Sequence, residues 1–283
     1  MKRKMLQCAN EMHTNLGRKC RKTGAAAAFV DACLETGRVS FALGEIESKT
    51  GLSRTAVKDQ LRRLGGRVVR ISRHQSFFVI VEPRHRPTGA PPVEWWLDAY
   101  FRWLGHPYYL ALQSAAEIYN SAPQAILVKQ VMTDVPRRDV AVGRLRIRFF
   151  VKRRVEGTPV EQPPNAYAPL RVSTREATAL DLIRYVSRTG GIGRATEMIM
   201  PLLPRFRTTA LRNALNAEDT PAVAQRLGYL IETAGHKRLA QMIHQWLPSG
   251  IVRVPLERSG HALAETPESR RWRLLVPAHG GQP

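Results

Sequence analysis

The segment that most constrains the fold is 46–64, IESKTGLSRTAVKDQLRRL, because it specifies a turn followed by a two-sided helix. Gly51 favours a tight turn, since glycine adopts left-handed backbone conformations without strain. Ser53 is a natural N-cap for a helix over 54–64. Its apolar residues recur at the i, i+4, i+7 spacing that places side chains on one helical face: Val57, Leu61 and Leu64. That face is therefore predicted to pack on a core.

The elements predicted around this segment follow a familiar order. A helix is expected over 24–37, a short extended piece follows, and a second helix is expected over 43–50 with Leu43 and Ile46 facing inward. After the third helix, two β-rich runs at 67–72 and 76–81 flank a short polar turn, which is typical of a hairpin. This order is that of a winged helix-turn-helix, and segment 46–64 resembles the bacterial helix-turn-helix pattern. We expect a DNA-binding domain over 23–82.

The third helix would enter the DNA major groove, which admits one α-helix. Its basic residues recur at i, i+4, i+8, on a different face from the apolar stripe. Ser53 would approach a phosphate from the helix N-terminus, and cations on the hairpin would reach the flanking backbone. The predicted DNA-binding residues are Ser53, Arg54, Thr55, Lys58, Arg62, Arg63, Arg67, Arg70, Arg73 and His74. A basic arm over 1–22 would add phosphate contacts from Lys2, Arg3, Lys4, Arg18, Lys19, Arg21 and Lys22.

The charge of the chain agrees with a polyanionic partner. Lys plus Arg is 44 and Asp plus Glu is 23, which gives a net charge of +21 over 283 residues. Residues 1–90 carry 18 basic and 7 acidic side chains, so just over half of the excess lies in the first third. Such asymmetry points to a nucleic-acid-binding N-terminal module. Three cysteines form no disulfide framework and no apolar run is long enough to span a membrane, so we expect a cytoplasmic protein.

The stretch 83–92, PRHRPTGAPP, predicts a linker to a larger mixed α/β domain over 93–283, and the chain as a whole is placed in the α+β class. Residues 93–120 are helical in period, interrupted at Gly105 and Pro107, and their aromatic residues are expected in the core rather than on a platform that stacks single-stranded bases. A buried strand is expected over 125–132 and a returning strand over 270–277. Ser173 followed by Glu176 predicts a capping box that opens a helix over 174–187. Residues 190–247 are almost entirely helical in pattern, with breaks at Pro201–Pro204 and Gly235.

Residues 144–151, RLRIRFFV, predict a strand with one basic and one apolar face, because successive side chains of a strand point to opposite sides. The basic face comprises Arg144, Arg146 and Arg148. It is either a second nucleic-acid surface or a solvated sheet face.

The sequence lacks the motifs of common catalytic sites. Cys8, His13, Cys20 and Cys33 do not have the paired short spacings of zinc sites. The GGIG stretch at 190–193 is not followed by the GK[ST] of a phosphate loop. We therefore expect no metal, no cofactor and no enzymatic activity.

Several segments, in this order and spacing, resemble the AbiEi family of antitoxins and transcriptional regulators from type IV toxin–antitoxin systems with phage-defence roles. After the N-terminal module these segments are YYLALQSAAEIYNSAPQAILVKQVMTD (108–134), VGRLRIRFFVKR (142–153), RVSTREATALDLIRY (171–185), QRLGYLIETAGH (225–236) and RWRLLVP (271–277).

The resemblance implies an autorepressor that binds repeats upstream of its own operon. It also implies a C-terminal domain that counters a nucleotidyltransferase-fold toxin encoded nearby, without requiring a stable complex with it. It supplies no catalytic residue. The alternative is an RNA-binding or toxin-binding module in which the winged helix is a secondary electrostatic anchor.

Overall fold

A computed structural model describes residues 24–122, 128–164, 166–257 and 263–277. The predicted arm and its cations lie outside the described residues. The rest divides into two compact units. The first runs up to Gly105 and includes Val140–Arg146, and the second comprises His106–Asp139 with the chain from Ile147 onward. The predicted linker 83–92 contains a short 3-10 helix, η2 (Pro83–His85), and lies within the first unit, so the domain boundaries drawn from the sequence stay a prediction.

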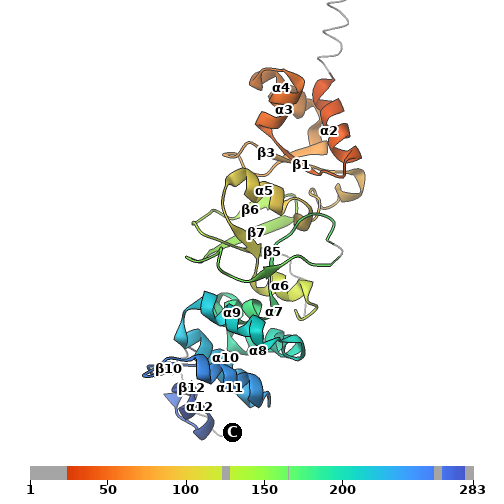
Figure 1. Ribbon diagram of the computed structural model, residues 1–283. Helices are drawn as coiled ribbons and strands as arrows, with labels where there is room; N and C mark the ends of the chain where they lie inside the picture. Colours follow the sequence, from red (N-terminus) through yellow and green to blue (C-terminus); the bar gives the residue numbers. More distant parts are fainter. Residues whose placement is uncertain (1–23, 123–127, 165, 258–262, 278–283) are drawn as a thin grey trace, which may run out of the picture. The chain divides into compact units, whose positions relative to one another are not determined.

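Three helices pack together in the first unit (Figure 1). They are α2 (Ala25–Glu35), α3 (Leu43–Thr50) and α4 (Arg54–Arg63). Gly51 ends α3 in the left-handed region, with φ of 62°, as its position in the turn requires. Val30, Ile46 and Val57 are fully buried in the core that these helices share. The helices and the turn between α3 and α4 are those expected from the sequence.

A three-stranded sheet closes this core. β1 (Ser40–Ala42) and β2 (Val68–Arg70) both pair antiparallel with β3 (Phe77–Ile80), in the order β1-β3-β2. Every residue of β3 is buried, as suits a central strand. A 3-10 turn, η1 (Gly65–Arg67), joins α4 to β2, and the hairpin predicted over 67–81 is confirmed. Further along the first unit, η3 (Val93–Trp95) leads into α5 (Leu97–Leu104).

A six-stranded mixed sheet follows, with the strand order β6-β7-β5-β4-β9-β8. Its strands are β4 (Tyr108–Leu110), β5 (Val128–Thr133), β6 (Val140–Val142), β7 (Leu145–Val151), β8 (Val160–Glu161) and β9 (Val172–Ser173). β4 pairs antiparallel with β5 and parallel with β9. A short helix, α6 (Leu112–Ile118), follows β4 directly.

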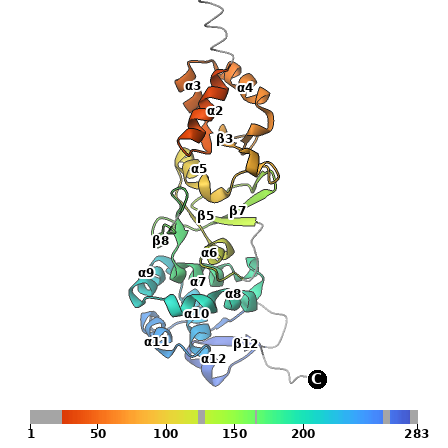
Figure 2. The same ribbon diagram turned by 90° about the vertical axis from the view of Figure 1, so that its right-hand side faces the viewer.

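The second unit is completed by helices around one large apolar core. α10 (Pro221–Thr233) lies between α7 (Arg175–Arg184) and α11 (Lys237–Trp246) (Figure 2). α8 (Gly191–Ile199) and α9 (Thr208–Glu218) also contact α7. The 3-10 segment η4 (Val186–Arg188) precedes α8, and η5 (Met200–Arg205) lies between α8 and α9. The helices and the break near Pro201 agree with the sequence pattern.

A small sheet forms near the C-terminal end of the described chain. β12 (Leu274–Pro277) pairs parallel with β10 (Val254–Pro255) and antiparallel with β11 (Leu263–Ala264). The returning strand is thus confirmed from Leu274, whereas Arg270 and Arg271 belong to a short helix, α12 (Pro267–Arg271). Trp272 follows this helix, is fully buried, and lies against α10 at Gly228.

Two local predictions are wrong. Tyr108–Leu110, expected within a helical stretch, form β4, because each side of this short segment is paired with a strand distant in sequence. The helix expected to begin after Ser173 has Thr174 as its N-cap, whose hydroxyl accepts a hydrogen bond from the Ala177 amide. Ser173 instead ends β9, and Glu176 accepts a hydrogen bond from the Arg207 amide rather than closing a capping box.

The mixed α and β class is confirmed. Among the described residues, no helix is both long and apolar enough to cross a membrane.

Candidate nucleic-acid interface

Helix α4 presents a polar side to solvent because its apolar side is used in the core. Val57 is fully buried and Leu61 is 6% exposed, whereas Arg54, Thr55 and Lys58 are exposed. The Ser53 hydroxyl accepts a hydrogen bond from the Ala56 amide at 3.4 Å, which satisfies one free donor of the first turn. The N-cap is confirmed; the expected approach of Ser53 to a phosphate stays a prediction.

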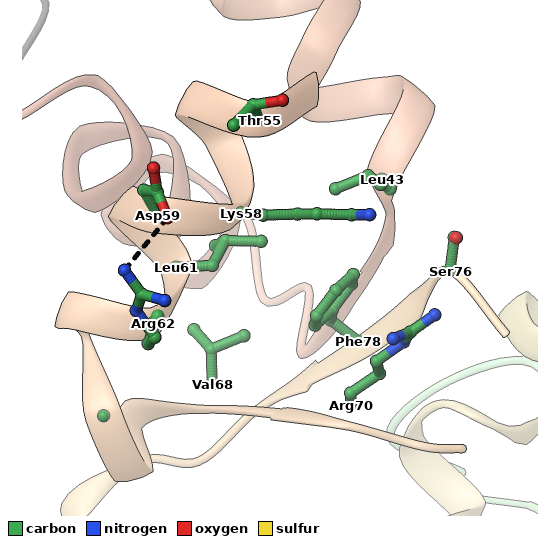
Figure 3. A pocket seen from close by; sticks show the side chains of 11 residues that line it. Leu43, Thr55, Lys58, Asp59, Leu61, Arg62, Val68, Arg70, Ser76 and Phe78 are labelled. Atoms are coloured by element: carbon green, nitrogen blue, oxygen red, sulfur yellow. Dashed lines mark ion pairs between the residues drawn. The ribbon is translucent and has the colours of Figure 1, made fainter. Parts of the chain in front are cut away.

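A hollow of about 580 Å³ lies between α4 and the β2–β3 hairpin. Its apolar lining comes from the core of the first unit, and its polar lining comes from α4 and the hairpin (Figure 3). Lys58 extends from α4 over this hollow. The lining residues are Leu43, Thr55, Lys58, Asp59, Leu61, Arg62, Gly65, Val68, Arg70, Ser76 and Phe78. The hollow therefore combines cations with hydroxyl groups above an apolar base.

The predicted cations of α4 differ in what they contact. Arg54 donates a hydrogen bond to the Ser76 hydroxyl at 3.2 Å and lies 4.0 Å from a Glu47 carboxylate oxygen, so it links α4 to the hairpin turn. Arg62 pairs with Asp59 at 3.0 Å. Lys58 and Arg63 are exposed. Lys58 is therefore placed to reach a ligand in the hollow without first breaking an ion pair.

The cations of the hairpin are also divided. The Arg70 Nε donates to the Gln75 carbonyl at 2.6 Å, which holds the two strands together at the turn. Arg67 pairs with Asp31 of α2 at 2.5 Å, so part of its charge is neutralised inside the unit. Arg73 and His74 lie at the exposed tip of the hairpin. The structure thus gathers Arg70, Arg73 and His74 at the hairpin and turns Arg67 toward α2.

Two residues of this region were not predicted from the sequence. Asp59 lies beside the basic stripe of α4 with a side chain that is 45% exposed, and its distance of two residues from both Val57 and Leu61 was a signal for an outward position. Ser76 contacts Arg54, which is 22 positions away in the sequence, and no local sequence pattern predicts such a contact.

The second predicted basic group is exposed on and beside β7. Arg146 donates to the carbonyl oxygens of Gly143 and Leu145, whereas Arg148 pairs with Asp139 at 3.3 Å. The side chain of Arg144 is exposed. The strand and the exposed positions of these three arginines agree with the predicted alternation, and their role as a second nucleic-acid surface stays a prediction.

Comparisons with known proteins bear mainly on the second unit. Residues 109–233 match the sequence model of the family described as "AbiEi antitoxin C-terminal domain". We call this matched stretch, which is less than half of the 283 residues, the AbiEi domain. The family resemblance drawn from the sequence is thereby confirmed, and the domain supports an antitoxin role in a toxin–antitoxin system. A comparison with curated protein sequences found no significant match.

Among solved structures, the chain is similar to one entitled "Crystal structure of RV2827C protein from Mycobacterium tuberculosis". The TM-score is 0.62 at 13% sequence identity, and the match covers 89% of this chain and 91% of the other. At this identity the likeness concerns the fold alone.

The AbiEi domain holds a buried network of charged groups. Lys152 is 5% exposed, and its Nζ lies 2.9 Å from an oxygen of the fully buried Asp181 and 3.2 Å from Glu218. Tyr109 donates a hydrogen bond to the other Asp181 oxygen at 2.9 Å, and Arg184 pairs with Glu218. The network connects Lys152, which follows β7, to Asp181 on α7 and Glu218 on α9. These elements are thereby held together in the interior of the domain.

The electrostatics of this network follow from its burial. Burial alone would lower the pKa of Lys152, but the carboxylates of Asp181 and Glu218 outweigh it and the pKa is raised. Burial, reinforced by the charge of Asp181, raises the pKa of Tyr109 well above its ordinary value. The lysine thus stays charged and the phenol stays neutral near pH 7.

The described residues contain no group of three or more His, Cys, Asp or Glu side chains placed to hold a metal ion. Cys8, His13 and Cys20 lie outside the described residues, and Cys33 is buried in the core of the first unit.

Proposed function

We propose that this protein is a DNA-binding antitoxin that represses its own operon. Residues 23–82 would act as a winged helix-turn-helix, with α4 as the helix that enters the major groove and the β2–β3 hairpin as the wing. The observation that carries the proposal is the two-sided character of α4, whose apolar side is buried while its cations remain in solvent beside the hairpin.

Physical arguments support duplex DNA as the partner. A helix fits the major groove of B-DNA, and Lys and Arg on such a helix neutralise phosphates and donate to guanine. Lys58 extends over the hollow between α4 and the hairpin, where its ammonium would meet a backbone phosphate beside the helix. The net charge of +21 favours association with any polyanion, so specificity has to be tested separately from affinity.

The test is binding of the full chain to duplex DNA from immediately upstream of its gene, against a scrambled duplex, over a salt series. A sequence-specific regulator should retain a preference of roughly 10³ or more for the upstream duplex at physiological salt. If both duplexes bind alike and their affinities fall together as salt rises, sequence-specific repression is excluded. In that case RNA or the toxin is the partner to test next, and the winged helix would be only a secondary electrostatic anchor.

A charge-matched pair of variants tests whether α4 is the binding element. Arg54→Ala with Lys58→Ala should lower the affinity for the upstream duplex more than tenfold. Lys237→Ala with Arg238→Ala removes the same charge from exposed positions on α11 and should change the affinity much less. Equal losses for the two variants would indicate that only net charge matters and that α4 is not the binding element.

The AbiEi domain motivates the second half of the proposal. We propose that this domain counters a nucleotidyltransferase-fold toxin encoded beside it. Co-expression with the neighbouring toxin should restore growth, and the Arg54→Ala, Lys58→Ala variant should still do so when both genes are driven by an external promoter. Affinity purification from the same cells then distinguishes direct contact from an indirect effect. Failure of the wild-type chain to restore growth would contradict the antitoxin proposal.

A further inference from the structure

The exposed side of α4 carries a carboxylate, that of Asp59. This is unexpected on a surface proposed to bind DNA, because DNA is itself an anion. Each residue of an α-helix turns the chain by about 100°, so two residues correspond to about 200°. Asp59 is two residues from Val57 and two from Leu61, which are the buried side chains of α4. Its side chain is accordingly 45% exposed, on the side opposite the core.

Asp59 belongs to an exposed ridge with the i, i+4, i+7 spacing, together with Thr55 and Arg62. The Arg62 side chain is 81% exposed, and its guanidinium lies 3.0 Å from Asp59 (Figure 3). The ion pair therefore lies on the solvent side of the helix, where the carboxylate restrains an otherwise free arginine.

Neither stability nor simple attraction to DNA accounts for this acid. An ion pair this exposed contributes little to folding, and a carboxylate facing phosphates lowers affinity for every sequence. A carboxylate has only acceptors, however, and in the major groove it is matched by the N4 amino group of cytosine, whereas the N6 amino group of adenine stands beside the acceptor N7, which suits an amide better than a carboxylate. Guanine N7 and O6 and thymine O4 are acceptors and would be rejected, while they remain available to arginine.

We infer that Asp59 is a specificity-determining residue of α4, which accepts a hydrogen bond from a cytosine amino group and orients Arg62 toward a neighbouring guanine. The inference rests on the proposed function, because it requires that α4 lie in the major groove. It assigns to Asp59 a selective role that the cations around it do not have.

The test compares two acids that have the same local chemistry but different positions. Asp31 on α2 also pairs with one arginine, Arg67, and its side chain is 54% exposed. Asp59→Ala and Asp31→Ala each remove one negative charge and release one arginine. Both should strengthen binding to a scrambled duplex by similar factors. Only Asp59→Ala should reduce the preference for the upstream duplex over the scrambled one, by about tenfold or more.

A series of upstream duplexes with single C·G pairs replaced by T·A should then locate the contact. The wild-type chain should lose affinity at the contacted pair, and Asp59→Ala should tolerate the replacement there. If the wild type prefers upstream DNA and Asp59→Ala keeps that preference as Asp31→Ala does, the inference is overturned while the proposed function stands. If the wild type has no preference, the proposed function fails and the inference fails with it.

Discussion

The residue with the largest predicted effect on stability is Lys152. Replacing it by Met would leave Asp181 and Glu218 as buried carboxylates without their common partner. Breaking a buried ion pair from one side costs about 3–5 kcal/mol, because the desolvated charge that remains is uncompensated. We expect Lys152→Met to lower the free energy of unfolding by roughly that amount, measured by urea denaturation.

Arg154 provides the matched control two residues further along the chain. It pairs with Asp219 at 2.8 Å, but both side chains are more than 60% exposed. Exposed pairs contribute about 0–1 kcal/mol, so Arg154→Met should be nearly neutral. Similar losses for Lys152→Met and Arg154→Met would show that burial of the network does not govern its contribution.

Lys58 is predicted to contact the DNA backbone rather than the bases, because its side chain extends over the hollow between α4 and the hairpin. Each phosphate contact adds about −0.9 to the slope of log affinity against log salt. Lys58→Gln should therefore make this slope shallower by about 0.9. It should lower the affinity for the upstream duplex and for the scrambled duplex by the same factor. Lys237→Gln on α11 is the charge-matched control. A selective loss of upstream binding by Lys58→Gln would assign Lys58 to base contact instead.

At the scale of elements, the packing of α10 depends on the absence of a side chain at Gly228. A Cβ added there would lie 2.0 Å from Cζ3 and 2.2 Å from Cη2 of the buried Trp272. Alanine favours a helix over glycine by up to about 1 kcal/mol, but overpacking a filled core costs about 1–3 kcal/mol. Gly228→Ala should therefore lower the free energy of unfolding, measured by urea denaturation.

Gly193 in α8 isolates the helix-propensity effect, since an added Cβ meets nothing within 4 Å. Gly193→Ala should raise the free energy of unfolding by about 0.5–1 kcal/mol. Destabilisation by both substitutions would contradict the view that Trp272 is the cause at Gly228.

The elements that were predictable are those with local signals. The signals for one turn and one helix lie within a few residues of one another, and the structure confirms them. They are the left-handed turn at Gly51, the N-cap at Ser53 and the buried side chains Val57 and Leu61. At Ser173 the local signal was ambiguous, because Ser173 and Thr174 are both capable caps. Pairing of Ser173 in β9 decided for Thr174.

Non-local contacts were not predictable in the same way. Tyr108–Leu110 becomes a strand because its partners, including Met132 and Val172, are supplied by segments far along the chain. The contacts of Asp181 are also non-local, since its partners Tyr109 and Lys152 are 72 and 29 positions away. At the candidate interface, the cationic stripe of α4 was predictable. The sequence did not show that Arg67 would pair with Asp31 or that Arg54 would bond to Ser76.

For the molecule as a whole, three fully or partly buried phenols predict a fold that weakens in alkaline solution. Burial raises the pKa of Tyr109, Tyr119 and Tyr185 above the ordinary value. In the unfolded chain these groups lose their protons near pH 10. Because the folded state retains the protons, the stability that these groups contribute is complete below pH 10 and is lost as pH rises beyond it. Lys152, whose pKa is also raised, acts in the same direction.

Each such group should steepen the fall of the free energy of unfolding by up to about 1.4 kcal/mol per pH unit. Tyr109→Phe is the sharpest test, since Tyr109 is fully buried and bonded to Asp181. The variant loses that hydrogen bond at every pH, but between roughly pH 10 and 11 its stability should fall less steeply than that of the wild type. Parallel curves for the wild type and Tyr109→Phe would mean that the phenol ionises as readily in the folded chain as in the unfolded one, which its burial beside a carboxylate argues against.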